Sequence, residues 1–427
     1  MPVFDTGPID NRNAPRTNLL TIRLFNTGRL PAIAGIEAYY INPTGTGLAS
    51  RTLYVLNIVT LDPFDKPDCS FTLDNVFANL DVFGVRIITS GLGANDIAVT
   101  ITEKATDGQI IKEHVLEGEL ARIEELLFVY VVNGLSNNVS VIDTGSNTIA
   151  ATVSGVALPG GVAITPSGLS AYVTNSISDS VGVIDTGTNT ITVTVPLPAG
   201  SGPSGIAITP DGSRAYVANF GNDTVSVIDT GSNTVTATVP LPAGADPQAI
   251  AITPDGSRAY VANFGNDTVS VIDTGTNTIT ATVPLAAGSD PRGVAITPDG
   301  SRAYVTNQGP NTVSVIDTGT NTIVATVVLP AFSDPSGIAI TPDGSRAYVA
   351  TANNLTVIHT GTNAVVGTVT GLSPVAIAIT PDGSRAYVAN FGSATVSMVD
   401  TVSNTVVATI SVGVAPFDIA ITPILLF

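Results

Sequence analysis

Short apolar strands separated by polar turns repeat from about residue 128 to the end of the chain. A Tyr-Val-x-Asn type of segment recurs with its tyrosine at Tyr130, Tyr172, Tyr216, Tyr260, Tyr304, Tyr348 and Tyr387. After each copy come segments of the Val-x-Val-Ile-Asp-Thr, Thr-Val-x-Ala-Thr-Val and Ile-Ala-Ile-Thr-Pro types. The β-branched residues and the Thr-Pro-Asp-Gly turns between them predict four short strands in each unit of about 40 to 45 residues.

Small apolar residues fall on both faces of these strands, as expected for sheets covered on both sides by neighbouring sheets. Four-stranded units of this length are typical of β-propeller blades. The first unit lacks an Ile-Ala-Ile-Thr-Pro strand before Tyr130, whereas the last unit is followed by an extra one at Asp418–Pro423. The pattern therefore predicts an all-β, seven-bladed propeller over residues 128–427, with the C-terminal strand as the innermost strand of the first blade.

The repeats resemble the YVTN family of β-propellers, on the strength of Tyr172-Val-Thr-Asn175, Tyr304-Val-Thr-Asn307 and the Ile-Asp-Thr and Thr-Pro-Asp-Gly elements. That family is similar to propellers of prokaryotic surface-layer and other cell-surface proteins. The sixth unit departs from the pattern, because Thr351 stands in place of the asparagine. The resemblance implies a propeller fold and display on a cell surface, although propellers carry many unrelated functions.

The first 127 residues do not share the repeat. Residues 1–16 are polar and contain Pro and Gly, which predicts a flexible arm. Seven strand-like runs with turns between them follow between Leu19 and Val115. Residues 17–127 are therefore predicted to form an antiparallel β-sandwich or jelly roll.

The composition is low in charge and strongly acidic: 12% of residues are charged and the net charge is −18. This balance excludes nucleic acid and anionic membranes as favoured partners, because both require a basic surface. No apolar run reaches the roughly 18 to 20 residues of a transmembrane helix. No secretory signal is recognisable at the start of the chain. This leaves a processed chain, another export route, or assembly onto a spore inside a mother cell, with a cytoplasmic location also open; a retained Met1 favours the spore.

Few residues offer chemistry. Cys69 is the only cysteine and the two histidines are His114 and His359. His359 replaces the hairpin aspartate of the other units, so we interpret it as a turn residue. We predict no catalytic residue, no metal site and no cofactor. The acidic loops leave a calcium site as an open alternative.

Two sets of residues are candidates for contacts. Phe220, Phe264 and Phe391 stand in Asn-Phe-Gly loops directly after the Tyr-Val-x-Asn type of segment, where they could stack on sugars or cap the packing between blades. Cys69 is interpreted first as a buried small apolar residue, with an intermolecular bridge as the alternative. With that alternative, Cys69 and the arm Met1 to Arg16 are the candidates for assembly, the arm by strand addition.

These observations favour a non-enzymatic structural or interaction protein of a prokaryotic cell or spore surface. Its sandwich and arm would mediate assembly or anchoring, and the propeller would be displayed. The expected partners are further copies of the chain, in an oligomer or filament, or other surface proteins, with glycans as a further possibility. The alternatives are a multivalent, lectin-like propeller and, with less support, a propeller enzyme such as a lactonase.

Overall fold

The computed structural model describes residues 127–423 throughout and, before them, only the strands of the N-terminal region. The chain divides into two compact units, which meet in sequence at Leu126 and Leu127. No helix among the described residues has the length and hydropathy needed to cross a membrane. The predicted seven-bladed propeller is confirmed for the second unit.

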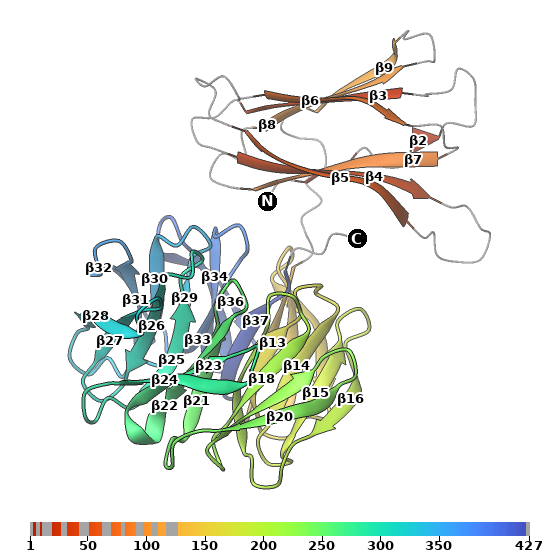
Figure 1. Ribbon diagram of the computed structural model, residues 1–427. Coiled ribbons are helices and arrows are strands. Elements are labelled where there is room, and N and C mark those ends of the chain that lie inside the picture. The colour runs from red at the N-terminus through yellow and green to blue at the C-terminus, as the bar shows by residue number, and fades with distance from the viewer. Residues whose placement is uncertain are drawn as a thin grey trace. The chain divides into compact units, whose positions relative to one another are not determined.

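Seven antiparallel sheets of four strands each form the blades of this propeller (Figure 1). The first three consist of β37 (Pro416–Ile421), β10 (Phe128–Asn133), β11 (Asn138–Asp143) and β12 (Thr148–Ser154); β13 (Pro159–Ile164), β14 (Ser170–Asn175), β15 (Ser180–Asp185) and β16 (Thr190–Pro196); and β17 (Pro203–Ile208), β18 (Arg214–Asn219), β19 (Thr224–Asp229) and β20 (Thr234–Pro240). The fourth and fifth consist of β21 (Pro247–Ile252), β22 (Arg258–Asn263), β23 (Thr268–Asp273) and β24 (Thr278–Pro284), with a 3₁₀ turn η2 (Phe264–Asn266); and β25 (Pro291–Ile296), β26 (Arg302–Asn307), β27 (Thr312–Asp317) and β28 (Thr322–Val328). The last two consist of β29 (Ile338–Ile340), β30 (Arg346–Thr351), β31 (Asn354–His359) and β32 (Ala364–Thr370); and β33 (Pro374–Ile379), β34 (Arg385–Asn390), β35 (Thr395–Asp400) and β36 (Thr405–Ser411).

The C-terminal strand closes the ring, as predicted. Strand β37 pairs antiparallel with β10, with Ala420 opposite Tyr130. Just beyond the strand, the Phe128 N–H donates to the Thr422 hydroxyl at 2.8 Å and the Thr422 N–H donates to the Phe128 carbonyl at 2.9 Å. The first blade is therefore built from both ends of the propeller sequence.

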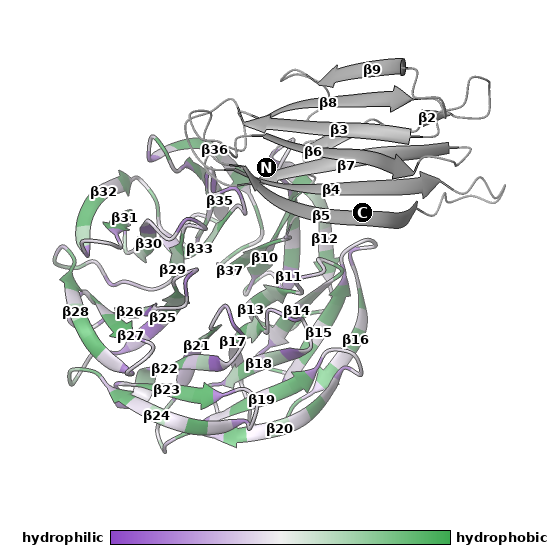
Figure 2. Cartoon of the chain, turned by 45° about the horizontal axis from the view of Figure 1, so that its top comes forward, coloured by the Kyte–Doolittle hydropathy of each residue, from purple (hydrophilic) through white to green (hydrophobic). Residues whose placement is uncertain are grey.

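The core lies between neighbouring blades. Each of seven hydrophobic clusters joins residues of two adjacent sheets, such as Tyr216 and Val227 of the third blade with Val261 and Ile272 of the fourth. The two middle strands of every blade are almost wholly buried, whereas the outer strands consist mostly of exposed and partly buried residues, as in β18, β19 and β20 of the third blade. Figure 2 shows apolar and more polar residues as green and paler bands along the outer strands β20 and β24.

The repeated tyrosines tie each blade to the next. The buried Tyr216 hydroxyl donates to Asn277 Oδ1 at 2.7 Å, and Asn277 occupies the left-handed position of a hairpin turn at φ 54°. Equivalent bonds link all seven blades, including one from Tyr387 to Asn147 at 3.2 Å across the closing seam. The tyrosine and the hairpin asparagine are thus the two halves of one recurring inter-blade contact.

The Asp-Gly-Ser-Arg turns contribute a second link. Asp211 accepts hydrogen bonds from the Thr209 hydroxyl and the Ser213 N–H within its turn, and these bonds lower its pKa from 3.8 to about 2. Arg214 donates instead to the Thr274 carbonyl of the next blade at 2.5 Å. The arginine therefore contributes to the packing of blades.

In the N-terminal region the strands form two antiparallel sheets, β1-β7-β4-β5 with β2 beside β7, and β6-β3-β8-β9. Their bounds are β1 (Val3–Asp5), β2 (Ile9–Asp10), β3 (Leu19–Asn26), β4 (Ala32–Ile41), β5 (Arg51–Leu61), β6 (Ser70–Phe77), β7 (Val82–Ser90), β8 (Ile97–Lys104) and β9 (Ile110–Leu116). The segment predicted as an arm supplies β1 and β2. Cys69 lies outside the described residues, and the sandwich stays a prediction.

Candidate active site

The inner strands of the blades share one sequence pattern, in which one position varies widely from blade to blade. Each inner segment starts with a proline and ends in Ile-Ala-Ile or Val-Ala-Ile. Its second residue is different in almost every blade. From the first blade to the seventh, these second residues are Phe417, Gly160, Ser204, Gln248, Arg292, Ser336 and Val375.

The third residue of the inner strand is small in six blades and acidic in one. It is Gly or Ala at 161, 205, 249, 293, 337 and 376, but it is Asp418 in the first blade. The inner strands approach closely here, since a Cβ added to Gly161 would lie 2.5 Å from the Ser204 carbonyl oxygen. An aspartate at this position is therefore an exception that the blade architecture does not require.

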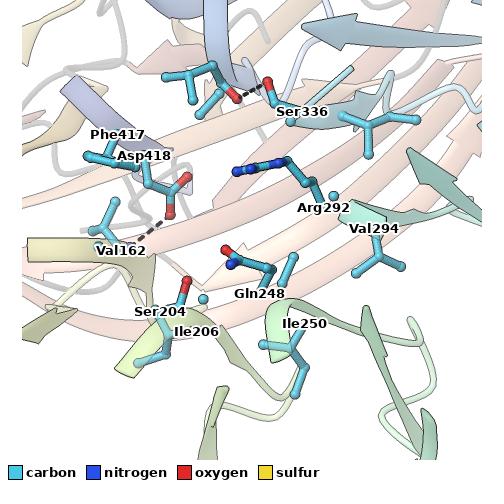
Figure 3. Close-up of a pocket in the computed structure, with 18 of the residues that line it drawn as sticks. Val162, Ser204, Ile206, Gln248, Ile250, Arg292, Val294, Ser336, Phe417 and Asp418 are labelled. Carbon is cyan, nitrogen blue, oxygen red and sulfur yellow. Dashed lines mark hydrogen bonds between the residues drawn. The ribbon is translucent and has the colours of Figure 1, made fainter. Parts of the chain in front are cut away.

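The varied residues surround a pocket of about 390 Å³ where the inner strands meet. All seven blades contribute to its lining, and Figure 3 shows side chains from the different inner strands arranged around it. Among the described residues that line it, Asp418 is the one acid and Arg292 is the one base. Ser204, Gln248 and Ser336 add neutral polar groups, and several isoleucines and valines complete the wall.

Asp418 is partly buried and held at one carboxylate oxygen. The Val162 N–H on β13 donates to Asp418 Oδ2 at 2.9 Å, the bond drawn in Figure 3. Burial raises the pKa of the Asp418 carboxyl from 3.8 to about 6, although hydrogen bonds from the Val162 and Ile419 N–H groups oppose the shift. A carboxyl with this pKa can accept and return a proton near neutral pH.

Arg292 is held in place by neutral neighbours. Its Nε donates to Gln308 Oε1 at 2.5 Å, and its guanidinium lies 5.0 Å from the centroid of the Phe264 ring. Burial lowers the pKa of Arg292, and the charges of Asp290 and Asp334 oppose that shift. The one ion pair within residues 127–423 joins Arg302 to Asp317, so no carboxylate in that range forms an ion pair with Arg292. The guanidinium can therefore receive an anionic group of a ligand.

None of the three predicted phenylalanines lines the pocket, but two of them contact residues that do. Phe264 lies against Arg292, and Phe391 meets Phe417 edge to face with ring centroids 5.2 Å apart. Phe220 is 38% exposed. Contact of these three phenylalanines with a ligand stays a prediction. His359 is an exposed hairpin residue outside the lining, and Cys69 and most of the arm Met1 to Arg16 lie outside the described residues.

Residues 161–326 match the family described as lactonase, 7-bladed β-propeller. Solved structures of similar fold include hydrazine synthase of Kuenenia stuttgartiensis, with 25% identity, a TM-score of 0.56, and coverage of 61% of this chain and 88% of that one. Two more are candidate 6-phosphogluconolactonases. The one from Bacteroides fragilis has 18% identity and a TM-score of 0.61, and the match covers 71% of this chain and 99% of that one. The one from Bacteroides uniformis has 16% identity and a TM-score of 0.59, and the match covers 69% of this chain and 99% of that one. No curated protein matches the sequence.

The family match contradicts the prediction of a non-enzymatic structural protein of a cell or spore surface. That prediction was wrong because it treated near-identical blades as evidence against a single specialised site. The identity lies in the middle strands and the hairpins, while the second and third residues of the inner strands differ around the ring. The scarcity of His and Glu also misled, because one buried aspartate can supply acid–base chemistry. The surface location and the partners stay predictions.

Sequence reasoning missed Asp418, Arg292, Gln248 and Phe417. Alignment of the seven inner segments would have found them, because at the second and third positions of these segments the repeat replaces small residues with charged, amide and aromatic ones. The depth of Asp418 in the pocket could not be found in this way, because it depends on how closely β37 approaches β13.

Proposed function

We propose that the propeller is a hydrolase that opens a lactone ring in the central pocket, with Asp418 as the general base. The observation that carries this proposal is the place of Asp418. It stands where six blades have Gly or Ala, and it lines the pocket that also contains Arg292. The match of residues 161–326 to the lactonase propellers supports the same reaction class.

The reaction needs one water molecule and one carboxylate. The Asp418 carboxylate takes a proton from water while the water oxygen attacks the lactone carbonyl carbon. Collapse of the tetrahedral intermediate breaks the bond between the carbonyl carbon and the ring oxygen. Protonated Asp418 returns its proton to that leaving oxygen, so the product is a hydroxy acid and the carboxylate is regenerated. The raised pKa of Asp418 suits both the removal and the return of this proton.

Two other polar side chains have roles in this scheme. Arg292 holds an anionic substituent of the substrate, and this fixes the lactone ring near Asp418. The Gln248 side chain extends into the pocket (Figure 3) and donates an N–H to the carbonyl oxygen as negative charge develops there. The names of the two candidate 6-phosphogluconolactonases support a lactone that carries an anionic group.

The test is hydrolysis of a panel of five- and six-membered lactones, with and without a carboxylate, followed by proton release in a pH-stat. We expect Asp418→Asn to lower kcat by about 10²- to 10⁴-fold, because the amide cannot accept the proton of water. The amide oxygen of this variant can still accept the hydrogen bond from the Val162 N–H, so the local structure should persist.

The matched control is Asp143→Asn. This aspartate caps a hairpin by accepting the N–H groups of Gly145 and Ser146, and it does not line the pocket. We expect it to keep the wild-type rate. Wild-type turnover in Asp418→Asn, or no hydrolysis of any lactone by the wild-type protein, would contradict the proposal.

A further inference from the structure

The rim of the pocket changes polarity around the ring. On one arc, formed by the seventh, first and second blades, the second residues of the inner strands are apolar or are glycine: Val375, Phe417 and Gly160. They are polar on the remaining arc, formed by the third to sixth blades: Ser204, Gln248, Arg292 and Ser336. A ligand that spans the pocket therefore meets an apolar surface on one side and hydrogen-bonding groups on the other.

Phe417 is the main residue of the apolar arc. Phe417 is 43% exposed and lines the pocket, and its ring packs edge to face against Phe391, which is itself 44% exposed. The interplanar angle of 77° at 5.2 Å is a favoured aromatic geometry. The two rings thus form a supported apolar surface that remains open to a ligand.

The loop of the first blade makes room for this ring. Gly134 follows Asn133 at the loop position where other blades have Phe220, Phe264, Gln308 or Phe391. A Cβ added to Gly134 would lie 2.9 Å from Phe417 Cδ2. The larger loop residue of other blades would therefore displace Phe417.

The polar arc fixes a cation at the other side. Gln308 and Phe264 belong to loops of the fifth and fourth blades, and together they hold the Arg292 guanidinium by a hydrogen bond and by a cation–π contact. Figure 3 shows Arg292 and Phe417 extending from different inner strands that border the same pocket. The charged end and the apolar end of a ligand would therefore be bound at separate places.

We infer that the substrate is an amphiphilic lactone, with a carboxylate bound at Arg292 and an aryl or short alkyl substituent packed on Phe417 and Phe391. This inference rests on the proposed function. A polyhydroxylated sugar lactone fits less well, because hydroxyl groups placed against Val375 and Phe417 would lose their hydrogen bonds to water without replacement. Phe417 and Asp418 are neighbours on β37 and both line the pocket, so a ligand that packs on Phe417 lies beside the strand that carries the general base.

The test compares three lactones that differ only in substituents: a carboxylated γ-lactone with a phenyl group, the same lactone without phenyl, and a hydroxylated analogue. We expect the phenyl lactone to have the highest kcat/KM. Phe417→Ala should lower kcat/KM for the phenyl lactone by about 10- to 100-fold and should change that for the unsubstituted lactone by less than about threefold. Phe332→Ala is the matched control, because Phe332 is 87% exposed and outside the pocket lining.

Binding of 3-phenylpropionate, measured by calorimetry, separates this inference from the proposed function. We expect Phe417→Ala and Arg292→Gln each to weaken its binding about tenfold or more, with Phe332→Ala unchanged. A preference for the hydroxylated lactone would overturn the inferred substrate but would still agree with the proposed lactone hydrolysis. If no lactone is hydrolysed, the proposed function fails, and the calorimetric result then tests only whether the pocket binds amphiphilic anions. Weaker binding in both variants supports such a pocket. No binding, or the same affinity in the variants as in the wild type, overturns it.

Discussion

Single side chains explain why the repeat has the sequence it has. The buried tyrosine of each blade packs in the core between two sheets and also donates a hydrogen bond to the hairpin asparagine of the next blade. The asparagine accepts because its left-handed backbone turns its side chain toward the neighbour, a conformation that asparagine tolerates better than most residues. A Tyr and an Asn that are 56 to 61 residues apart in six of the seven contacts, and 240 residues apart at the closing seam, therefore form one contact repeated around the ring.

The hydrogen bond can be tested by removing the hydroxyl alone. Tyr216→Phe should lower the free energy of unfolding by about 1 kcal/mol, because Asn277 Oδ1 loses a donor at 2.7 Å in a partly buried place. Tyr387→Phe is the comparison, since its bond to Asn147 is longer, at 3.2 Å, and should contribute less. Chemical denaturation gives both values. Equal losses, or a larger loss for Tyr387→Phe, would contradict this account.

The inner strands both hold the ring together and line the pocket, and one short sequence segment in each blade carries both roles. Their proline, their Ile-Ala-Ile end and the small third residue maintain the close approach of seven strands. The strand number, the blade boundaries and the ring closure could all be predicted from the sequence, because period and β-branched composition determine them. The pocket could not, because the burial of Asp418 and the placement of Arg292 over Phe264 depend on contacts between blades.

The closing strand provides a test at this scale. A chain that ends at Ala415 lacks β37, so β10 keeps only β11 as a partner and Phe128 loses both bonds to Thr422. We expect its melting temperature to fall by about 10 °C or more, because several kcal/mol of packing are lost from the seam. A chain that ends at Pro423 keeps all of β37 and should melt close to the full chain. An unchanged melting temperature for the shorter chain would show that the seam does not support the ring.

The whole propeller combines a nearly symmetric frame with an asymmetric pocket. Seven clusters between blades and seven tyrosine bonds repeat the same packing, and this leaves the second and third residues of the inner strands available to vary. Among the described lining residues, the one acid and the one aromatic residue are on β37, whereas the one base is on β25. Such an arrangement suits a single asymmetric ligand, and it explains how a repetitive protein can contain one specialised site.

The most direct test of the central claim is the pH dependence of kcat/KM for a carboxylated lactone. The Asp418 carboxyl must be unprotonated to act as the base, and its pKa is about 6. We therefore expect activity to be constant above about pH 7 and to fall tenfold per pH unit well below pH 6, with the low-pH ionisation absent from the residual activity of Asp418→Asn. A wild-type profile without an ionisation near pH 6, or the same profile in Asp418→Asn, would contradict the assignment of Asp418 as the general base.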